Sequence, residues 1–257
     1  SRMQFAIRLR SARYSLPSAF GRGLQIGLPL TAVIVASVPI WGMGWYFDTE
    51  NWAAGIWNSW AASRTDTWRA AMVRAVVGSG LTTLDGRGFA VAPENLTGTE
   101  PFSFIVIGDT GEGDASQHVL KDSLLQAANA DDVRFVVVSS DVVYPTGAMK
   151  DYESRFWLPF KGVTKPVYAI PGNHDWYDAL EGFVATFFHP DAARIAMRAR
   201  IAADGGVSST TEARIEELIR RADFLRRQYG VPTGAQDAPF FQIQTSSFAL
   251  IAVDTGV

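Results

Sequence analysis

The sequence contains no cysteine and only three histidines among its 257 residues. The lack of cysteine excludes disulfide bonds and metal sites built from thiolates, and it leaves the redox compartment open. The formal net charge of −3 argues against a nucleic-acid-binding protein, because such proteins usually present a basic surface. With 47% hydrophobic and 19% charged residues, the composition is that of a folding chain with some membrane character.

Three short hydrophobic runs each end in a loop with acidic or amide side chains. The runs are residues 104–107, 135–138 and 166–170. Their length is that of buried strands, and helical spacing follows the last of them. Because the carboxyl ends of parallel strands meet at one edge of a sheet, we expect the three loops to converge. Taken alone, the last loop (171–175) could also be an ordinary polar turn.

The three loops carry oxygen donors that suit a metal ion. These donors are Asp109, Asp141, Tyr144 and Asn173, and His174 follows the last of them. Clustered carboxylates repel one another unless a cation neutralises them. Carboxylate, phenol and amide oxygens are hard ligands, compatible with iron or manganese. A metal site is therefore the simplest explanation for the three loops.

In chain order the loops read Gly-Asp-Thr-Gly (108–111), Ser-Asp-Val-Val-Tyr (140–144) and Gly-Asn-His-Asp (172–175). This series resembles the calcineurin-like metallophosphoesterase superfamily, and Gly111 and Tyr144 make it most similar to the purple acid phosphatase branch. The resemblance covers residues 102–257. It implies an α/β fold, namely a metallophosphoesterase-type β-sandwich flanked by helices and incomplete at the C-terminus.

The resemblance implies an enzyme that hydrolyses phosphate esters with two metal ions, of iron, manganese or zinc. Asp141 would bridge the two ions, because a carboxylate can offer one oxygen to each. Asp109 and Tyr144 would complete the ligands of the first ion, and Asn173 would bind the second. In the purple branch the tyrosine binds ferric iron, so one Fe(III) with a divalent ion is compatible with this set.

The resemblance also implies two catalytic side chains, His174 and Asp175. His174 would hydrogen-bond the phosphate and protonate the leaving oxygen, a general-acid role that an imidazole fills near neutral pH. Asp175 would orient His174 and raise its basicity.

The chain departs from the family pattern at several positions. Ser140 stands where the family has glycine, at a modest cost if its backbone angle is ordinary. Histidine is scarce: we expect His118 to be exposed on a helix and His189 to be a loop residue or, alternatively, to reach the site. The family takes further histidine ligands from strands that would follow Val257. We therefore expect a partial chain that is inactive by itself and belongs to a longer protein that is the enzyme. The alternative function is that of a non-catalytic, membrane-anchored interaction module.

Residues 24–47 carry no charged side chain. A helix of this length, at ~1.5 Å per residue, would cross the ~30 Å hydrocarbon layer of a membrane. Arginines precede the run, and Asp48 and Glu50 follow it, so the positive-inside rule places residues 1–23 in the cytoplasm and the catalytic domain outside. A cleaved signal peptide and a buried hairpin of a soluble core are the alternatives. We expect an uncleaved, single-pass anchor.

The rest of the chain divides into two parts. Residues 48–100 predict a tryptophan-rich helix, lying on the membrane surface or packed on the catalytic domain, and then a linker from residue 86. Residues 101–257 form the predicted metallophosphoesterase domain, with a helical insertion at 176–236. In that insertion, Ser209 and Glu212 resemble a capping box, and helical spacing continues to Gly230.

Three smaller elements are also predicted in this domain. Asp114 is a candidate N-cap for a helix that runs to about residue 129. Residues 152–160 predict a short helix with Phe156, Trp157 and Phe160 turned inward. Residues 240–244 and 248–253 predict a hairpin.

Overall fold

The computed structural model describes residues 28–33, 49–82, 89–93, 96, 101–246 and 248–255. The chain divides into two compact units, Ser1–Asn51 and Trp52–Val257. In the first unit, residues 28–33 form a short helix. Among the helices of the described ranges, none combines the length and the apolar character needed to cross a membrane. Apart from residues 28–33, the predicted span 24–47 and the basic segment 1–23 lie outside the described residues.

Most of the long helix α2 (Thr49–Gly78) belongs to the second unit. Trp68, Met72 and Val76 recur every four residues and therefore share one face of the helix. All three are at most 1% exposed and belong to the main core cluster of the unit. Of the two placements that the sequence left open, this part of the helix therefore packs on the core of the second unit.

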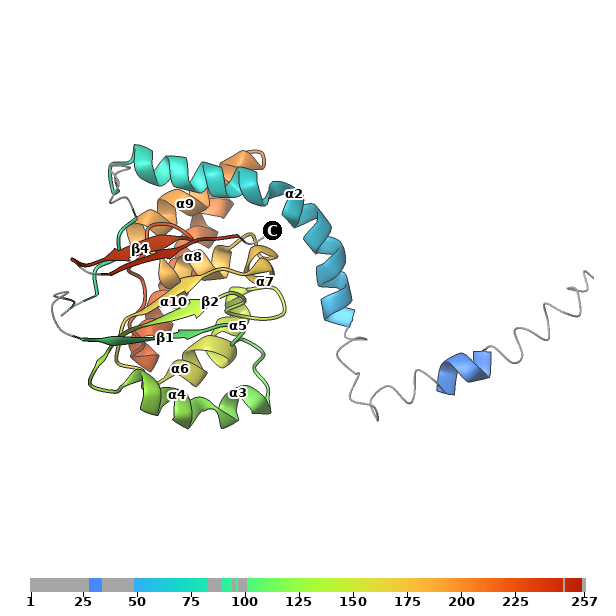
Figure 1. Cartoon of the computed structure of the whole chain (residues 1–257). Coiled ribbons are helices and arrows are strands. Elements are labelled where there is room, and N and C mark those ends of the chain that lie inside the picture. Colours follow the sequence, from blue (N-terminus) through green and yellow to red (C-terminus); the bar gives the residue numbers. More distant parts are fainter. Residues whose placement is uncertain are drawn as a thin grey trace, which may run out of the picture. The chain divides into compact units, whose positions relative to one another are not determined.

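A parallel sheet forms the centre of the second unit. Its strands are β1 (Ser103–Ile107), β2 (Val133–Ser139) and β3 (Val167–Ile170), in the order β1-β2-β3. All three predicted strands and their parallel direction are confirmed. Since the strands run the same way, the loops after them emerge at one edge of the sheet (Figure 1).

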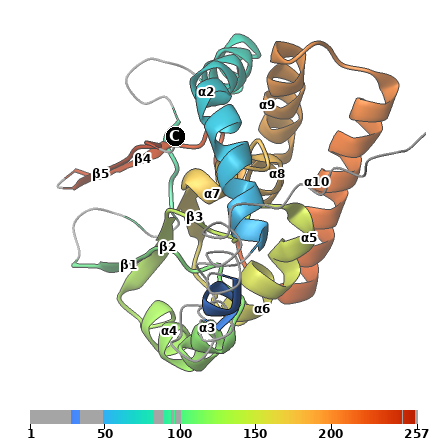
Figure 2. The same ribbon diagram turned by 90° about the vertical axis from the view of Figure 1, so that its right-hand side faces the viewer.

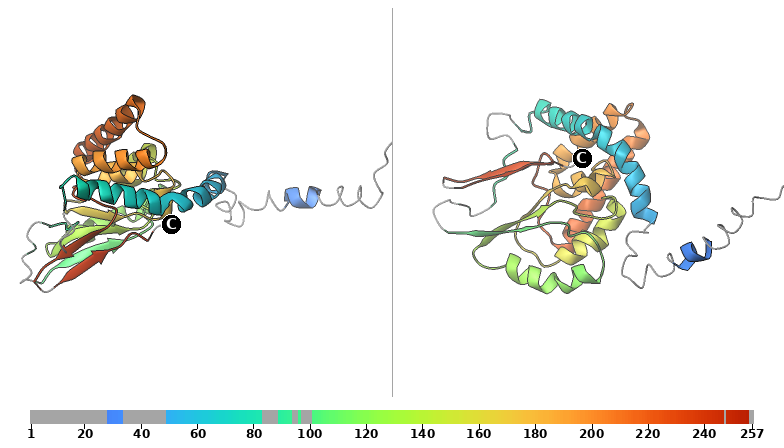
Figure 3. Two further views of the ribbon diagram at one scale, coloured as in Figure 1. Left: turned by 90° about the horizontal axis from the view of Figure 1, so that it is seen from above. Right: turned by 45° about the vertical axis from the view of Figure 1, so that its right-hand side comes forward.

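The two faces of this sheet are covered differently, because successive residues of a strand point to opposite faces. Phe135 of β2 packs with the antiparallel hairpin of β4 (Phe241–Gln244) and β5 (Ala249–Ala252). The next residue, Val136, packs with the helices instead. The left view of Figure 3 shows the hairpin and the helices against the sheet. The α/β class that the sequence predicts is therefore confirmed, and within the described residues it consists of a small three-stranded parallel sheet, a two-stranded hairpin and helices.

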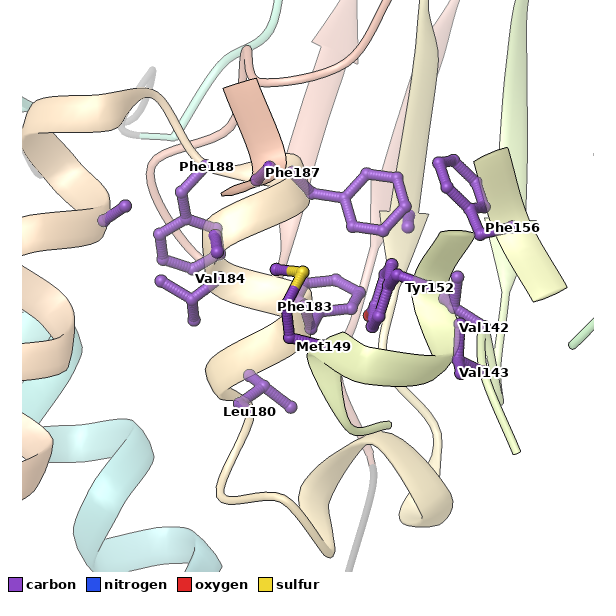
Figure 4. Close-up of a cluster of buried hydrophobic side chains, with 14 of the residues drawn as sticks. Val142, Val143, Met149, Tyr152, Phe156, Leu180, Phe183, Val184, Phe187 and Phe188 are labelled. Atoms are coloured by element: carbon purple, nitrogen blue, oxygen red, sulfur yellow. The ribbon is translucent and has the colours of Figure 1, made fainter. Parts of the chain in front are cut away.

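Helices cover the face opposite the hairpin. They include α4 (Lys121–Ala128), α5 (Met149–Tyr152), the π-helical turn η2 (Glu153–Trp157), α6 (Leu158–Phe160), α8 (Glu181–Phe187), α9 (Pro190–Ala203) and α10 (Ser209–Tyr229). Figure 2 shows α8, α9 and α10 together, and Figure 4 shows aromatic side chains of α8 pointing toward α5 and η2. In that core the rings of Phe156 and Phe187 meet edge to face at 5.2 Å. Phe156, Trp157 and Phe160 are buried, as predicted.

The predicted helix after Asp114 is divided in two. The Asp114 carboxylate caps its start as expected, accepting hydrogen bonds from the backbone N–H groups of Ser116 and Gln117. The helix then breaks at Leu120, where ψ is −8°, into α3 (Ala115–Val119) and α4 (Lys121–Ala128).

The capping box of α10 lies one residue before the predicted one, so the prediction was wrong in detail. Ser208 is the N-cap, and its hydroxyl accepts from the Thr211 N–H while the Thr211 hydroxyl accepts from the Ser208 N–H. Glu212 instead forms an ion pair with Arg198 of α9. The local sequence motif could not reveal this partner, because it lies on another helix. The helix ends at Gly230, whose φ of +66° suits a residue without a β-carbon.

The described part of the predicted linker is packed rather than free. Phe89 and Val91 are each 6% exposed, and Ala90 forms a parallel bridge with Gln242 of β4. This short segment therefore extends the small sheet.

Candidate metal centre

Backbone hydrogen bonds join the three loops at the carboxyl edge of the parallel sheet. The Asp109 N–H donates to the Ser140 carbonyl at 3.1 Å, and the Ser140 N–H donates to Ile170 at 3.0 Å. The Tyr144 N–H donates to the Gly111 carbonyl at 3.1 Å. Each bond connects two neighbouring strand ends or loops, so the loops converge as the sequence predicts.

Two glycines allow this close approach. A β-carbon at Gly172 would lie 2.1 Å from Asp141 Oδ1 and 2.4 Å from the Asp141 nitrogen. A β-carbon at Gly111 would lie 2.1 Å from the Val142 carbonyl oxygen. Both separations are far below van der Waals contact, so any larger residue would push the loops apart.

The hydroxyl of Tyr144 joins the carboxylates of the first two loops. It lies 2.9 Å from Asp141 Oδ2 and 3.2 Å from Asp109 Oδ1. Since a hydroxyl carries one hydrogen, it can donate fully to only one of these oxygens at a time. Burial, followed by the negative charge of Asp141, raises the pKa of Tyr144 well above its usual value. The protonated phenol thus offsets part of the repulsion between the two carboxylates.

His174 lies directly against this group. It belongs to the short helix α7 (Asn173–Trp176), and its backbone N–H donates to Asp141 Oδ1 at 2.9 Å. Its ring centroid is 4.5 Å from that of Tyr144. The Nδ1 atom is 2.6 Å from the Pro145 carbonyl oxygen. A carbonyl can only accept, so Nδ1 carries the hydrogen and Nε2 is left for other chemistry.

Asp175 was expected to orient His174, but its carboxylate binds backbone N–H groups instead. Its carboxylate is fully buried and accepts from the backbone N–H groups of Val142 at 3.0 Å, Val143 at 3.3 Å and Gly172 at 3.0 Å. Burial raises the pKa of Asp175 to about 7, outweighing these bonds, which lower it. Asp175 therefore ties the second loop to the third, while the neighbouring imidazole is oriented by the Pro145 carbonyl.

Asn173 is held by a residue that the sequence did not single out. Its Nδ2 donates to the Tyr177 hydroxyl at 2.6 Å, which leaves Oδ1 as the atom that could face a cation. The spacing of four residues within a helical segment is the signal that could have revealed this pair. Asp109 and Asp141 thus each contact the Tyr144 hydroxyl, whereas Asn173 is linked to Asp141 through the backbone N–H of the next residue, His174.

The available oxygens fit part of a ligand set for a hard cation. Carboxylate, phenol and amide oxygens suit iron, manganese and similar ions. The glycine at 172 lets the third loop approach Asp141 closely, because a β-carbon there would overlap Asp141 Oδ1. In the part of the chain that the structure describes, however, no three acidic, histidine or cysteine side chains are grouped closely enough to hold an ion. The four predicted ligands would therefore supply only a portion of a complete site.

Backbone strain is concentrated at the two carboxylates. Asp109 has φ +52°, Ser140 has φ +79° and Asp141 has φ +40°. A non-glycine residue in this left-handed region costs roughly 1–3 kcal/mol, and such residues cluster at functional sites. The modest cost expected at Ser140 assumed an ordinary backbone angle. That condition is not met, because the turn places Ser140 in the region that favours glycine.

The two other histidines lie outside this group. His118 is exposed on α3, as expected. His189 is also exposed, precedes α9 as its N-cap residue, and donates its backbone N–H to the Gln236 carbonyl. Of the two expectations for His189, that of a loop residue fits the structure.

Comparison with known proteins gives a match over the part of the chain that contains the three loops. Residues 102–217 match the family model described as calcineurin-like phosphoesterase, whereas no curated protein and no solved structure matches the chain. The match starts just before β1 and ends within α10, so it includes all three loops. Residues 102–217 are therefore similar to a calcineurin-like phosphoesterase domain.

Proposed function

We propose that the protein is a metal-dependent phosphoesterase that hydrolyses phosphate esters where the three loops meet. The observation that carries this proposal is the approach of Asp109 and Asp141 to one hydroxyl, that of Tyr144. Carboxylates brought this close are stabilised by a cation. The family match over the same loops supports a phosphate ester as the substrate.

The proposed ligands belong to a centre of two metal ions, of iron, manganese or zinc. Asp141 would bridge the ions, with Asp109 and Tyr144 on one of them and Asn173 Oδ1 on the other. When bound, the ions supply Lewis acidity toward the phosphate group. The phenol of Tyr144 between two carboxylates is the observation that favours the purple acid phosphatase branch, in which the tyrosine binds ferric iron.

His174 is the proposed general acid, acting through Nε2. Its Nδ1 hydrogen is directed at the Pro145 carbonyl, so the cationic imidazole can release the Nε2 proton to the leaving oxygen. The neutral ring that remains keeps its bond to Pro145. Asp175 would assist indirectly, because its bonds to Val142 and Gly172 fix the loops that carry Asp141 and His174.

We also propose that residues 24–47 anchor the protein in a membrane, with the catalytic domain outside the cytoplasm. The support is the uncharged run itself, which arginines precede and Asp48 and Glu50 follow. Membrane fractionation, with protease digestion of intact cells, tests this. Recovery of the domain in the soluble fraction, or its protection from protease, would contradict the topology.

The phosphoesterase proposal is tested on the full-length gene product with a colorimetric phosphatase assay in added Mn²⁺ or iron. We expect hydrolysis that Asp141→Ala abolishes. The matched control is Asp131→Ala, which removes an exposed carboxylate before the start of β2 and should leave the rate unchanged. Equal activity in wild type and Asp141→Ala would overturn the assignment.

A second candidate function is a non-catalytic, membrane-anchored interaction module that keeps the fold. The strained Ser140, at the position where glycine would be relaxed, is the observation that favours it. Calorimetric titration of the full-length protein with Mn²⁺ distinguishes the two. Absence of both binding and turnover would support the interaction module, and binding with turnover would exclude it.

A further inference from the structure

Three side chains connect helix α2 to the candidate metal centre, and we call them the Arg69 clamp: Arg69, Trp176 and Asp254. The Arg69 Nε donates to Asp254 Oδ2 at 2.7 Å. The indole N–H of Trp176 donates to Asp254 Oδ1 at 3.3 Å. The Arg69 guanidinium also lies over the Trp176 ring, 5.2 Å from its centroid. Each member of the clamp thus contacts the other two.

The clamp is largely removed from solvent. The side chain of Asp254 is 0% exposed and that of Arg69 is 19% exposed, while Trp176 is 1% exposed. A buried carboxylate is costly unless it is paired and hydrogen-bonded, and Arg69 and Trp176 provide both interactions. Arg69 also pairs with Asp66, but that side chain is 97% exposed, where ion pairs contribute little. Of these two ion pairs, the buried one with Asp254 therefore restrains Arg69 more than the exposed one with Asp66 does.

Trp176 places the clamp next to Asn173 and His174, two residues of the proposed site. It is the last residue of α7, a helix of four residues that begins with Asn173 and His174. At the other end of α7, the Asp175 carboxylate holds the backbone of Gly172. The short helix is therefore fixed at both ends, and it cannot rotate without separating the buried Arg69–Asp254 pair from the indole.

We propose that Arg69 is a positioning residue for the metal centre, acting through Asp254 and Trp176 to hold Asn173 Oδ1 and His174 Nε2 in place. The inference rests on the proposed function for the roles of Asn173 and His174. Arg69 precedes the family match and Asp254 follows it, so the clamp joins segments on both sides of residues 102–217 to the site. Helix α2 would then be a component of the catalytic unit.

The test compares three variants of the full-length protein. Trp176→Phe keeps an aromatic ring but removes the indole N–H, and Arg69→Lys keeps the charge but removes the planar guanidinium. The matched control is Arg64→Lys, the same change on the same helix, because Arg64 pairs with Asp204 after α9 and lies over the ring of Trp60. Hydrogen exchange of residues 172–177 and Mn²⁺ affinity, by the electron paramagnetic resonance of the free ion, are the two measurements.

We expect both clamp variants to exchange about tenfold faster at residues 172–177, with the rest of the unit unchanged. We also expect Mn²⁺ to bind about tenfold more weakly, the usual effect of losing a residue that orients ligands. Arg64→Lys should match wild type in both measurements. Wild-type exchange in both clamp variants would overturn the inference, as would faster exchange throughout the unit, which indicates a purely structural role.

The two proposals can fail separately. If the wild-type protein binds no Mn²⁺ while the clamp variants still exchange faster at residues 172–177, the metal site fails and the positioning of α7 by Arg69 stands. If Mn²⁺ binds equally to all variants and exchange is unchanged, the metal site stands and the clamp fails.

Discussion

Gly172 packs so closely on Asp141 that a β-carbon on the glycine would lie 2.1 Å from the Asp141 Oδ1 atom. The third loop therefore rests directly on a proposed bridging ligand of the second. The position of that carboxylate depends on the backbone of a residue that takes no part in the chemistry.

Gly172→Ala should disable the site and lower the stability of the fold. The added methyl group would also lie 2.4 Å from the Asp141 backbone nitrogen, so relief requires the loops to move apart. Overpacking of this kind costs about 1–3 kcal/mol, measurable by urea denaturation, and we expect phosphatase activity to be lost. The control is Gly78→Ala at the end of α2, where nothing lies within 4 Å of the new β-carbon. Normal activity in Gly172→Ala would show that the loops are not tightly coupled.

Ser140→Gly should increase stability by roughly 0.5–1 kcal/mol, because glycine adopts the φ of +79° without strain. Urea denaturation of wild type and variant measures the change. The neighbouring substitution Ser139→Gly is the control: Ser139 lies in β2 and is not among the residues of positive φ, so glycine there should destabilise the strand. A loss of stability in Ser140→Gly would mean that contacts of the serine side chain stabilise the fold by more than its backbone strain destabilises it.

His174→Gln should slow hydrolysis in a way that depends on the leaving group. A general acid contributes about 10²–10⁴-fold when the leaving oxygen needs a proton. We therefore expect kcat for phenyl phosphate to fall much more than kcat for 4-nitrophenyl phosphate, whose leaving group is already stable as an anion. His118→Gln, on the exposed side of α3, should change neither rate. An equal loss with both substrates would assign His174 to binding or structure instead of proton transfer.

The stability of the fold should depend on pH through Asp178, beside the site. Burial, and then the negative charge of Glu181, raises the pKa of Asp178 to about 7, although Arg214 and Arg200 lower it. Below about pH 4 both the folded and the unfolded chain hold this proton. Between about pH 4 and pH 7 only the folded chain keeps the proton on Asp178. The contribution of Asp178 to the free energy of unfolding therefore falls as pH rises through this range and is constant above it.

Asp178→Asn removes this titration. Relative to the wild type, the free energy of unfolding of the variant should rise by roughly 2–4 kcal/mol between pH 4 and pH 8. Chemical denaturation at a series of pH values measures the difference. If that difference is the same at every pH, the pKa of Asp178 is not raised in the folded protein.

Much of the site could be predicted because it follows from local patterns. Short apolar runs that end in polar residues identify parallel strands whose loops meet, so Asp109 and Asp141 could be placed together from the sequence alone. Helix spacing was equally informative for α10, whose first turn was misplaced by one residue only. Contacts between distant segments gave no such signal. The partner of the His174 imidazole is a backbone carbonyl, and a carbonyl is present at every position of a sequence.

The amino-acid sequence by itself determined which strands form, which residue types stand at their carboxyl ends and where the helices stop, because these features depend on neighbours a few residues away. Only the tertiary structure decided that Ser140 takes a left-handed backbone angle, that Asp175 binds loops instead of the imidazole, and that Arg69 reaches Asp254 across 185 positions of the chain. The physical reason is that backbone strain, burial and ion pairing at these residues are set by the packing of distant segments.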